Sequence, residues 1–155
     1  MDKGNLIANN ADSLFMAEVY FIGSVTSISD EDATINIFEK YCPGLLGIEE
    51  YSHLIILFWL HERDDEAHRG TLQVYPRRHG ETTLRGVYAC RSPSRPNPIG
   101  LTVVELLAVD KCNLKVKGLD ALVGSPVIDI KPYSTRSDCY PGAYTPDWSQ
   151  RGSPS

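Results

Sequence analysis

The stretch Ile99-Gly-Leu-Thr-Val-Val-Glu-Leu-Leu-Ala-Val109 decides the fold, because it is long, rich in β-branched residues and apolar on two faces. Val103 and Val104 are adjacent, so an extended backbone points them to opposite sides. A strand with aliphatic side chains on both sides needs cover on both sides. The stretch therefore predicts a closed or covered sheet.

On either side of this stretch lie shorter segments with strand composition, namely residues 18–27, 33–38, 51–60, 72–75, 86–90, 113–117 and 126–130. Gly23 predicts a bulge or a close backbone approach. Residues 45–50 favour one helical turn, and residues 62–66 favour a loop or short helix. Neither βαβ spacing nor Gly-x-Gly-x-x-Gly is present. The sequence predicts an all-β protein, mainly an antiparallel β-barrel with short helical insertions.

The length of 155 residues fits one domain. We expect a loose N-terminal leader over residues 1–16, the barrel domain over 17–135 and a C-terminal tail over 136–155 that is frayed at its end.

Composition indicates a cytoplasmic protein without a membrane segment. The longest apolar run, Leu54 to Leu60, is far below the roughly 20 residues of a membrane helix, and residues 1–5 show no signal-peptide pattern. The four cysteines form no Cys-x-x-Cys pair, and His53 and His61 would lie roughly 26 Å apart on a strand, so no metal site is predicted. Without an export signal we expect reduced, mostly buried thiols, with two disulfides as the alternative.

A net charge of −5 is not typical of a general nucleic-acid-binding protein, but the charge is unevenly distributed along the chain. Residues 69–98 hold six arginines and one glutamate, a net charge of +5, which leaves −10 for the remainder. Arginine binds phosphate or carboxylate through two parallel hydrogen bonds. This pattern predicts an RNA surface that includes Arg77, Arg78 and Arg95, and the alternative is a charged rim that only aids solubility.

A proline loop, Arg91-Ser-Pro-Ser-Arg-Pro-Asn-Pro98, precedes the long strand. Its three prolines restrict the backbone, so the loop loses little entropy when a ligand binds. Pro93, Pro96 and Pro98 are candidates for cis peptide bonds. The loop is either a binding site with oriented arginines or a stiff connector between strands.

A third segment, Lys117-Gly-Leu-Asp-Ala-Leu-Val-Gly-Ser-Pro-Val-Ile-Asp-Ile-Lys-Pro-Tyr133, combines a turn with a strand. Asp120 and the backbone amides near Gly124 are candidates for contacts with a ribose or a base. Asp129 either pairs with a nearby arginine or is a functional group.

The strings from Arg91 to Leu101 and from Gly118 to Tyr133, together with Ile22-Gly-Ser-Val-Thr-Ser27 and Gly47-Ile-Glu-Glu-Tyr-Ser-His53, closely resemble the TsaA-like family, also called TrmO or YaeB. The resemblance covers about residues 17–135.

The resemblance implies a small β-barrel that binds S-adenosylmethionine (S-adenosyl-L-methionine) and forms a homodimer, with the cofactor near the subunit interface. It also implies a methyltransferase that acts on N6 of threonylcarbamoyl-adenosine next to the tRNA anticodon. The implied cofactor-binding residues are His61, Glu62, Arg91, Leu101, Gly118, Leu119 and Asp120. Asp129 and Tyr133 are candidates for the base that removes a proton from the attacking nitrogen, and the sequence assigns neither.

The chain departs from the family pattern at Val123, which replaces a carboxylate, at Ser125, which replaces a threonine, and at Glu62, which replaces a glutamine. We also expect it to lack the C-terminal domain of longer bacterial forms. Two alternative functions are an S-adenosylmethionine-binding sensor without turnover and a methyltransferase for another RNA or a small molecule.

Overall fold

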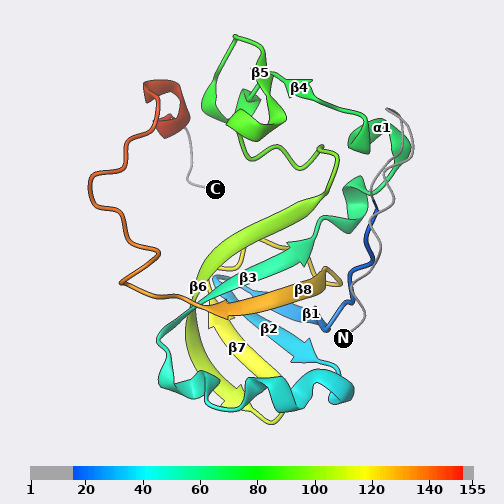
Figure 1. The fold of residues 1–155 in the computed structure, drawn as a ribbon, viewed down its shortest axis with the longest axis vertical. Helices are drawn as coiled ribbons and strands as arrows, with labels where there is room; N and C mark the ends of the chain where they lie inside the picture. The colour runs from blue at the N-terminus through cyan, green and yellow to red at the C-terminus, as the bar shows by residue number, and fades with distance from the viewer. Residues whose placement is uncertain (1–15, 152–155) are drawn as a thin grey trace, which may run out of the picture.

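Antiparallel strands close into a barrel in the order β1-β2-β7-β6-β3-β8 in the computed structural model, which describes residues 16–151 (Figure 1). The strands are β1 (Gly23–Ser29), β2 (Asp32–Ile37), β3 (His53–Trp59), β6 (Ile99–Asp110), β7 (Asn113–Lys117) and β8 (Pro126–Pro132). β6 is the longest strand and pairs with both β3 and β7. The predicted all-β class is confirmed.

The core of the barrel follows from the two-residue period of its strands. Leu54, Ile56 and Phe58 of β3 are buried, while Ile55 and Leu57 between them are half-buried on the outer face. The same alternation buries Ala33, Ile35 and Ile37 in β2 and Leu114 and Val116 in β7. An aliphatic interior, with the alternate side chains on the outer face, is what sequences of this period predict.

The N-terminal strand begins later than predicted, because β1 starts at Gly23 rather than near residue 18. The composition of residues 18–22 suits a strand, but β8 pairs with β1 only through Gly23 and Ser24. At Gly23 an added Cβ would lie 2.3 Å from the carbonyl oxygen of Asn36, so the predicted close backbone approach is confirmed.

Two 3₁₀ turns, η1 (Glu39–Leu45) and η2 (Ile48–Glu50), cross one end of the barrel, where a helical turn was predicted. Cys42 of η1 forms a disulfide with Cys112, while Cys90 and Cys139 are free. The prediction that all thiols are reduced is therefore wrong for this pair. The two residues are 70 positions apart in sequence, and only the closed barrel brings their Cα atoms within 5.3 Å.

Between β3 and β6 the chain leaves the barrel and forms a lobe, residues 61–98, at the top of Figure 1. Its elements are η3 (His61–Arg63), α1 (Glu66–Arg69), β4 (Gln73–Val74), η4 (Arg77–His79), β5 (Arg85–Gly86) and η5 (Val87–Ala89). The strand predicted over residues 86–90 is wrong, because β4 offers only two residues for pairing and the chain then turns into η5.

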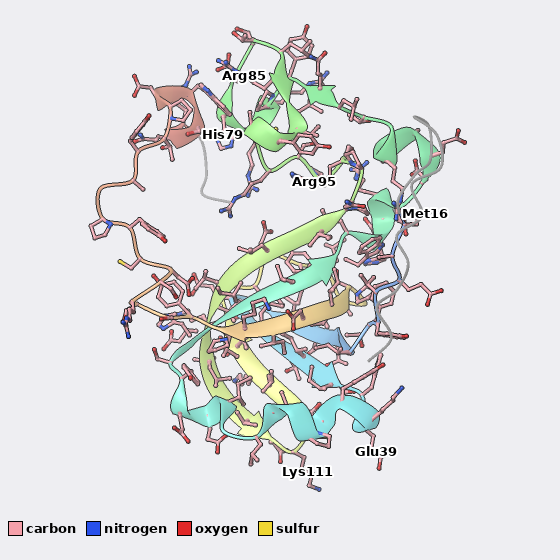
Figure 2. The ribbon with its side chains drawn as sticks, in the orientation of Figure 1. Met16, Glu39, His79, Arg85, Arg95 and Lys111 are labelled. Carbon is pink, nitrogen blue, oxygen red and sulfur yellow. A yellow bond between two sulfur atoms is a disulfide. The ribbon has the colours of Figure 1, made fainter. Side chains whose placement is uncertain are left out.

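The C-terminal segment runs from β8 back toward the lobe and ends in η6 (Asp147–Gln150), shown in red in Figure 1. Trp148 lies against His79, with ring centroids 5.8 Å apart, and the Arg85 guanidinium carbon lies 5.2 Å from the centre of the Trp148 ring. Figure 2 shows His79 and Arg85 pointing from the lobe toward this segment. The predicted leader, except Met16, and the predicted frayed end at 152–155 lie outside the described residues. No helix within residues 16–151 has the length and apolar character needed to cross a membrane.

Candidate functional site

The end of β3 is fixed by a cluster of Trp59, Asp64 and Arg69. The predicted site residues His61 and Glu62 lie between Trp59 and Asp64 in sequence, and both are exposed. The Trp59 indole N–H donates to Asp64 Oδ2 over 2.9 Å, and Arg69 Nε donates to Asp64 Oδ1. The Arg69 guanidinium carbon also lies 5.4 Å from the centre of the Trp59 ring. Hydrogen bonds from Arg69 and then Trp59 hold the pKa of Asp64 below its usual value.

Arg69 connects this cluster to the proline loop. Its Nη1 donates to the carbonyl oxygen of Pro96 over 3.0 Å, and the Leu60 N–H donates to that of Pro98 over 2.7 Å. Within the loop, Arg95 Nη1 donates to the Ser92 carbonyl over 3.1 Å, and Figure 2 shows Arg95 between lobe and barrel. No peptide bond within residues 16–151 is cis, so the prolines suggested as cis candidates are trans. The loop is held to the end of β3 at two points.

Leu101 and Asp129 share a row on the outer face of the sheet. Leu57 of β3 is paired with Leu101 of β6 on one side and with Asp129 of β8 on the other. Directly opposed residues point to the same face, so Leu101 and Asp129 are separated by two strand spacings, about 10 Å. Asp129 Oδ2 lies 2.8 Å from Lys131 Nζ, so its partner is a lysine and not the arginine considered from the sequence.

The predicted residues Gly118, Leu119 and Asp120 follow the end of β7. Lys117 is paired with Glu105, four residues along β6 from Leu101. Gly118 has a φ of +87°, in the left-handed region that favours glycine. Its N–H donates to the backbone carbonyl oxygen of Glu31. Leu119 packs against the core, and Asp120 is exposed.

The backbone amides of Leu122 and Gly124, in the turn over residues 122–125, donate hydrogen bonds to other groups of the protein. The Gly124 N–H donates to the Val25 carbonyl over 2.7 Å, and the Leu122 N–H donates to Ser125 Oγ over 3.1 Å. The prediction that the Gly124 amide is free for a ligand is therefore wrong, because the turn closes on β1 and on buried Ser125.

Neither of two hollows in the described residues is lined by a predicted cofactor residue, although Lys117, next to Gly118, lines one and Asp129 lines the other. One, of about 390 Å³, is lined by Tyr41, Leu45, Ile48, Tyr51 and Ile130 among others. The other, of about 520 Å³, lies at the β1–β2 turn beside Lys115 and Lys117. Of the predicted cofactor residues, all but Leu119 are exposed in the single chain.

The lobe carries the predicted RNA-binding residues Arg77 and Arg78 on exposed η4, and Arg91 is exposed nearby in sequence. Glu81 is buried, with Oε2 at 3.3 Å from Arg85 Nη2 and at 3.6 Å from Arg151 Nη2. The Thr83 backbone N–H, together with Arg85, holds the pKa of Glu81 below its usual value. Trp148 and Arg151 were missed by sequence reasoning, and an isolated tryptophan in a polar segment is the signal that could have found them.

Of the two candidate bases, Tyr133 packs edge-on against His53 with ring centroids 6.4 Å apart. Burial, with smaller contributions from Cys139 and Asp138, raises the pKa of its hydroxyl. A raised pKa leaves Tyr133 protonated at neutral pH, which disfavours it as a proton acceptor.

Comparisons with known proteins agree with this fold. The chain is 55% identical over 111 residues to an S-adenosyl-L-methionine-binding protein of Archaeoglobus fulgidus, covering 72% of this chain and 76% of that protein. It is 43% identical over 98 residues to a tRNA (adenine(37)-N6)-methyltransferase of Mus musculus, covering 63% of this chain and 22% of that one. Its structure matches a crystal structure of TrmO from Pseudomonas aeruginosa with a TM-score of 0.66 and 26% identity, over 84% of this chain and 62% of that chain.

The model of the tRNA-methyltransferase O N-terminal domain matches residues 24–139. This range covers the barrel from Ser24 onward, the lobe and the start of the C-terminal segment. The chain therefore belongs to the tRNA-methyltransferase O family, a family of S-adenosylmethionine-dependent tRNA methyltransferases.

Proposed function

We propose that the protein transfers the methyl group of S-adenosylmethionine to N6 of threonylcarbamoyl-adenosine next to the tRNA anticodon. Family membership supports the reaction class, and the similar mouse protein is named as a tRNA (adenine(37)-N6)-methyltransferase. The observation that carries the proposal is the meeting of the β3 end, the proline loop and the outer face of β6 at one edge of the barrel.

The proposed cofactor residues fit the chemistry of S-adenosylmethionine. The exposed Arg91 guanidinium suits the amino-acid carboxylate, the Asp120 carboxylate suits the ribose hydroxyls, and Leu101 offers an apolar contact for the adenine. His61, Glu62, Gly118 and Leu119 complete the proposed set. Bound S-adenosylmethionine supplies a methyl group on a positively charged sulfonium.

The protein contributes mainly alignment, because methyl transfer is an in-line displacement. The sulfonium loses its charge during transfer, so arginines serve best at the carboxylate and at RNA phosphates, away from the sulfur. The attacking nitrogen must lose a proton, and Asp129 is the favoured acceptor because it shares a row with Leu101. Asp129→Asn is expected to lower the rate of transfer while leaving cofactor affinity unchanged.

A homodimer completes this site in the proposal. Ile99, Leu101 and Val103 of β6 are 39%, 46% and 44% exposed on one face, beside half-buried Ile55 and Leu57. A second copy placed on this apolar face would cover the proposed adenine contact and enclose the open site. Light scattering of the purified protein should give twice the mass of 17.2 kDa, and Val103→Asp should give the monomer and weaker cofactor binding.

The anticodon loop is the proposed RNA partner, and Arg77, Arg78 and Arg95 are its proposed contacts. Arg95 Nη1 donates to the backbone carbonyl oxygens of Cys90 and Ser92, so the other nitrogens of its guanidinium would contact the RNA. Replacing Arg77 and Arg78 together by Ala should lower the salt dependence of tRNA affinity by roughly one to two units, since each phosphate contact contributes about 0.7–0.9. A tRNA substrate also supports a cytoplasmic location.

The decisive experiment combines calorimetry with mass spectrometry of tRNA nucleosides. The protein should bind S-adenosylmethionine, and Arg91→Ala should weaken binding by about 1.5–3 kcal/mol. Arg136→Ala, an exposed arginine in the C-terminal segment, is the matched control and should bind normally. Incubation with tRNA should convert threonylcarbamoyl-adenosine to its N6-methyl form. Binding without transfer would support the sensor, and methylation of another nucleoside would support a different RNA substrate.

A further inference from the structure

The backbone conformation and surroundings of Gly86 do not require a glycine at this position. Its φ of −66° and ψ of 145° are open to any L-residue, and an added Cβ would meet nothing within 4 Å. The glycines at positions 47, 80, 118 and 124 have positive φ, and Gly23 and Gly100 are crowded, so those six have structural reasons. Gly86 is half-buried and its carbonyl accepts from Cys90 Sγ, so the space left by the missing side chain lies on the Cβ side of the residue.

Two exposed tyrosines come shortly after the paired residues of β4 and β5. Gly86 is paired with Gln73, and the next pair is Val74 with Arg85. Tyr75 lies two residues beyond Gln73, past the Val74–Arg85 pair, and Tyr88 lies two residues beyond Gly86 in the opposite direction, within η5. Tyr75 is 53% exposed and Tyr88 is 77% exposed. We call Tyr75, Gly86 and Tyr88 the tyrosine platform; Gln73, which is also exposed, is the residue directly opposite Gly86.

The charges around the tyrosine platform are positive. Arg77 follows Tyr75 by two residues, and Arg91 follows Tyr88 by three, and both are exposed. Glu81 is the one acidic residue within 69–98, and it is buried against Arg85 and Arg151. A polyanion can therefore approach the tyrosine rings without meeting an exposed carboxylate of this segment.

We propose that the tyrosine platform stacks unpaired bases of an RNA loop, with the open backbone at Gly86 giving a base room to lie flat. This inference rests on the proposed action on tRNA and adds the recognition of single-stranded bases. Aromatic rings stack on bases that are splayed out of a helix, whereas bases within a duplex are already stacked on one another. The flanking arginines would hold the phosphates of the same loop.

The test compares an RNA hairpin that has an unpaired loop with a blunt RNA duplex of equal length. Tyr88→Ala and Tyr75→Ala should each weaken hairpin binding on the order of 5- to 150-fold, the usual range for one stacked base. Tyr88→Phe should keep wild-type affinity, because the ring carries the interaction. The slope of affinity against salt should stay constant in these variants, because no phosphate contact is lost.

Matched controls come from the C-terminal segment. Tyr144→Ala removes a tyrosine that is 95% exposed and should leave hairpin binding unchanged. Gly86→Ala should weaken hairpin binding, whereas Gly142→Ala, which also has open space for a Cβ, should not. Unchanged melting temperatures of all variants would exclude a folding defect.

Equal losses for hairpin and duplex, or wild-type binding by both tyrosine-to-alanine variants, would overturn the tyrosine platform. Competition by poly-glutamate as strong as that by the hairpin would also overturn it, because the surface would then serve an acidic protein. The nucleoside assay separates the two proposals. Hairpin-specific, tyrosine-dependent binding without methyl transfer would leave the tyrosine platform standing and reject the enzyme, whereas methyl transfer with unaltered tyrosine variants would do the opposite.

Discussion

The barrel is stabilised by one kind of interaction and the lobe by another. The barrel closes around a continuous aliphatic core contributed by all six of its strands. Within residues 61–98, by contrast, only Glu81, Val87 and Pro98 are buried. The lobe depends on hydrogen bonds from Arg69, on buried Glu81 and on the Trp148 ring from the C-terminal segment.

Because of this difference, we expect the stability of the protein to depend mainly on the barrel and RNA binding to depend mainly on the lobe. Burial of apolar area stabilises the barrel, and the outer row of β6 and β8 can carry functional groups without loss of core. The lobe carries exposed arginines and tyrosines, and few of its side chains contribute to a core. We therefore expect changes in the barrel to alter global unfolding and changes in the lobe to alter local opening and RNA binding.

Ile56→Ala should have the largest effect, because Ile56 is fully buried in the middle of β3. Removing such a side chain and leaving a cavity costs about 2–5 kcal/mol. Urea unfolding followed by far-UV circular dichroism measures the loss. Leu46→Ala, at a side chain that is 94% exposed, is the control and should change the free energy of unfolding by less than about 0.5 kcal/mol. Equal effects of the two changes would contradict a barrel-centred core.

Replacing Cys42 and Cys112 together by Ser should lower the free energy of unfolding by about 2–4 kcal/mol. The disulfide closes a loop with a sequence separation of 70, which includes the whole lobe, so its loss acts mainly on the unfolded chain. Cys139→Ser, at an exposed free thiol, is the control. A chain as stable in reducing buffer as in oxidising buffer would show that the disulfide contributes nothing.

The same contrast explains what the sequence could predict. Residues 113–117 alternate strictly and form β7 as expected, and the apolar run of residues 51–60 contains β3. Local pattern is enough there, because each strand exposes its core face at every second residue. The disulfide and the docking of Trp148 on His79 join residues about 70 positions apart, which no local pattern reports. The proposed cofactor residues rest on resemblance, and strand register adds only that Leu101 of β6 lies opposite Leu57.

Trp148→Ala should open the lobe without unfolding the barrel. The change removes the edge-on contact with His79 and the cation–π contact with Arg85, which together contribute about 1–2 kcal/mol. Amide hydrogen exchange over residues 77–85 should accelerate, while exchange in β3 and β7 stays slow. Tyr140→Ala, which is 72% exposed in the same segment, is the control. Faster exchange throughout the barrel would show that lobe and barrel unfold as one unit.

Acid should open the lobe before the barrel, and this is the smallest effect expected. The pKa of Glu81 is lowered from 4.5 in the folded protein, first by the Thr83 backbone N–H and also by Arg85. The stability that Glu81 contributes is therefore fully present above the ordinary pKa and is lost as pH falls through the lowered folded value. The aliphatic core of the barrel has no ionisable side chain among the described residues, so its amides should stay protected over that range. Hydrogen exchange over residues 77–88, measured from pH 5 downward, should show the lobe opening in the wild type. Glu81→Gln should remove the pH dependence that Glu81 contributes, by giving residues 77–88 that are already open, and should leave the contribution of Asp64 and Asp65, whose pKa values are also lowered. Glu39→Gln, placed at the opposite end of the molecule in Figure 2, is the control and should behave as the wild type. If Glu81→Gln kept the wild-type profile, the carboxylate would not be what holds the lobe closed, and Trp148 and Arg69 would have to do so alone.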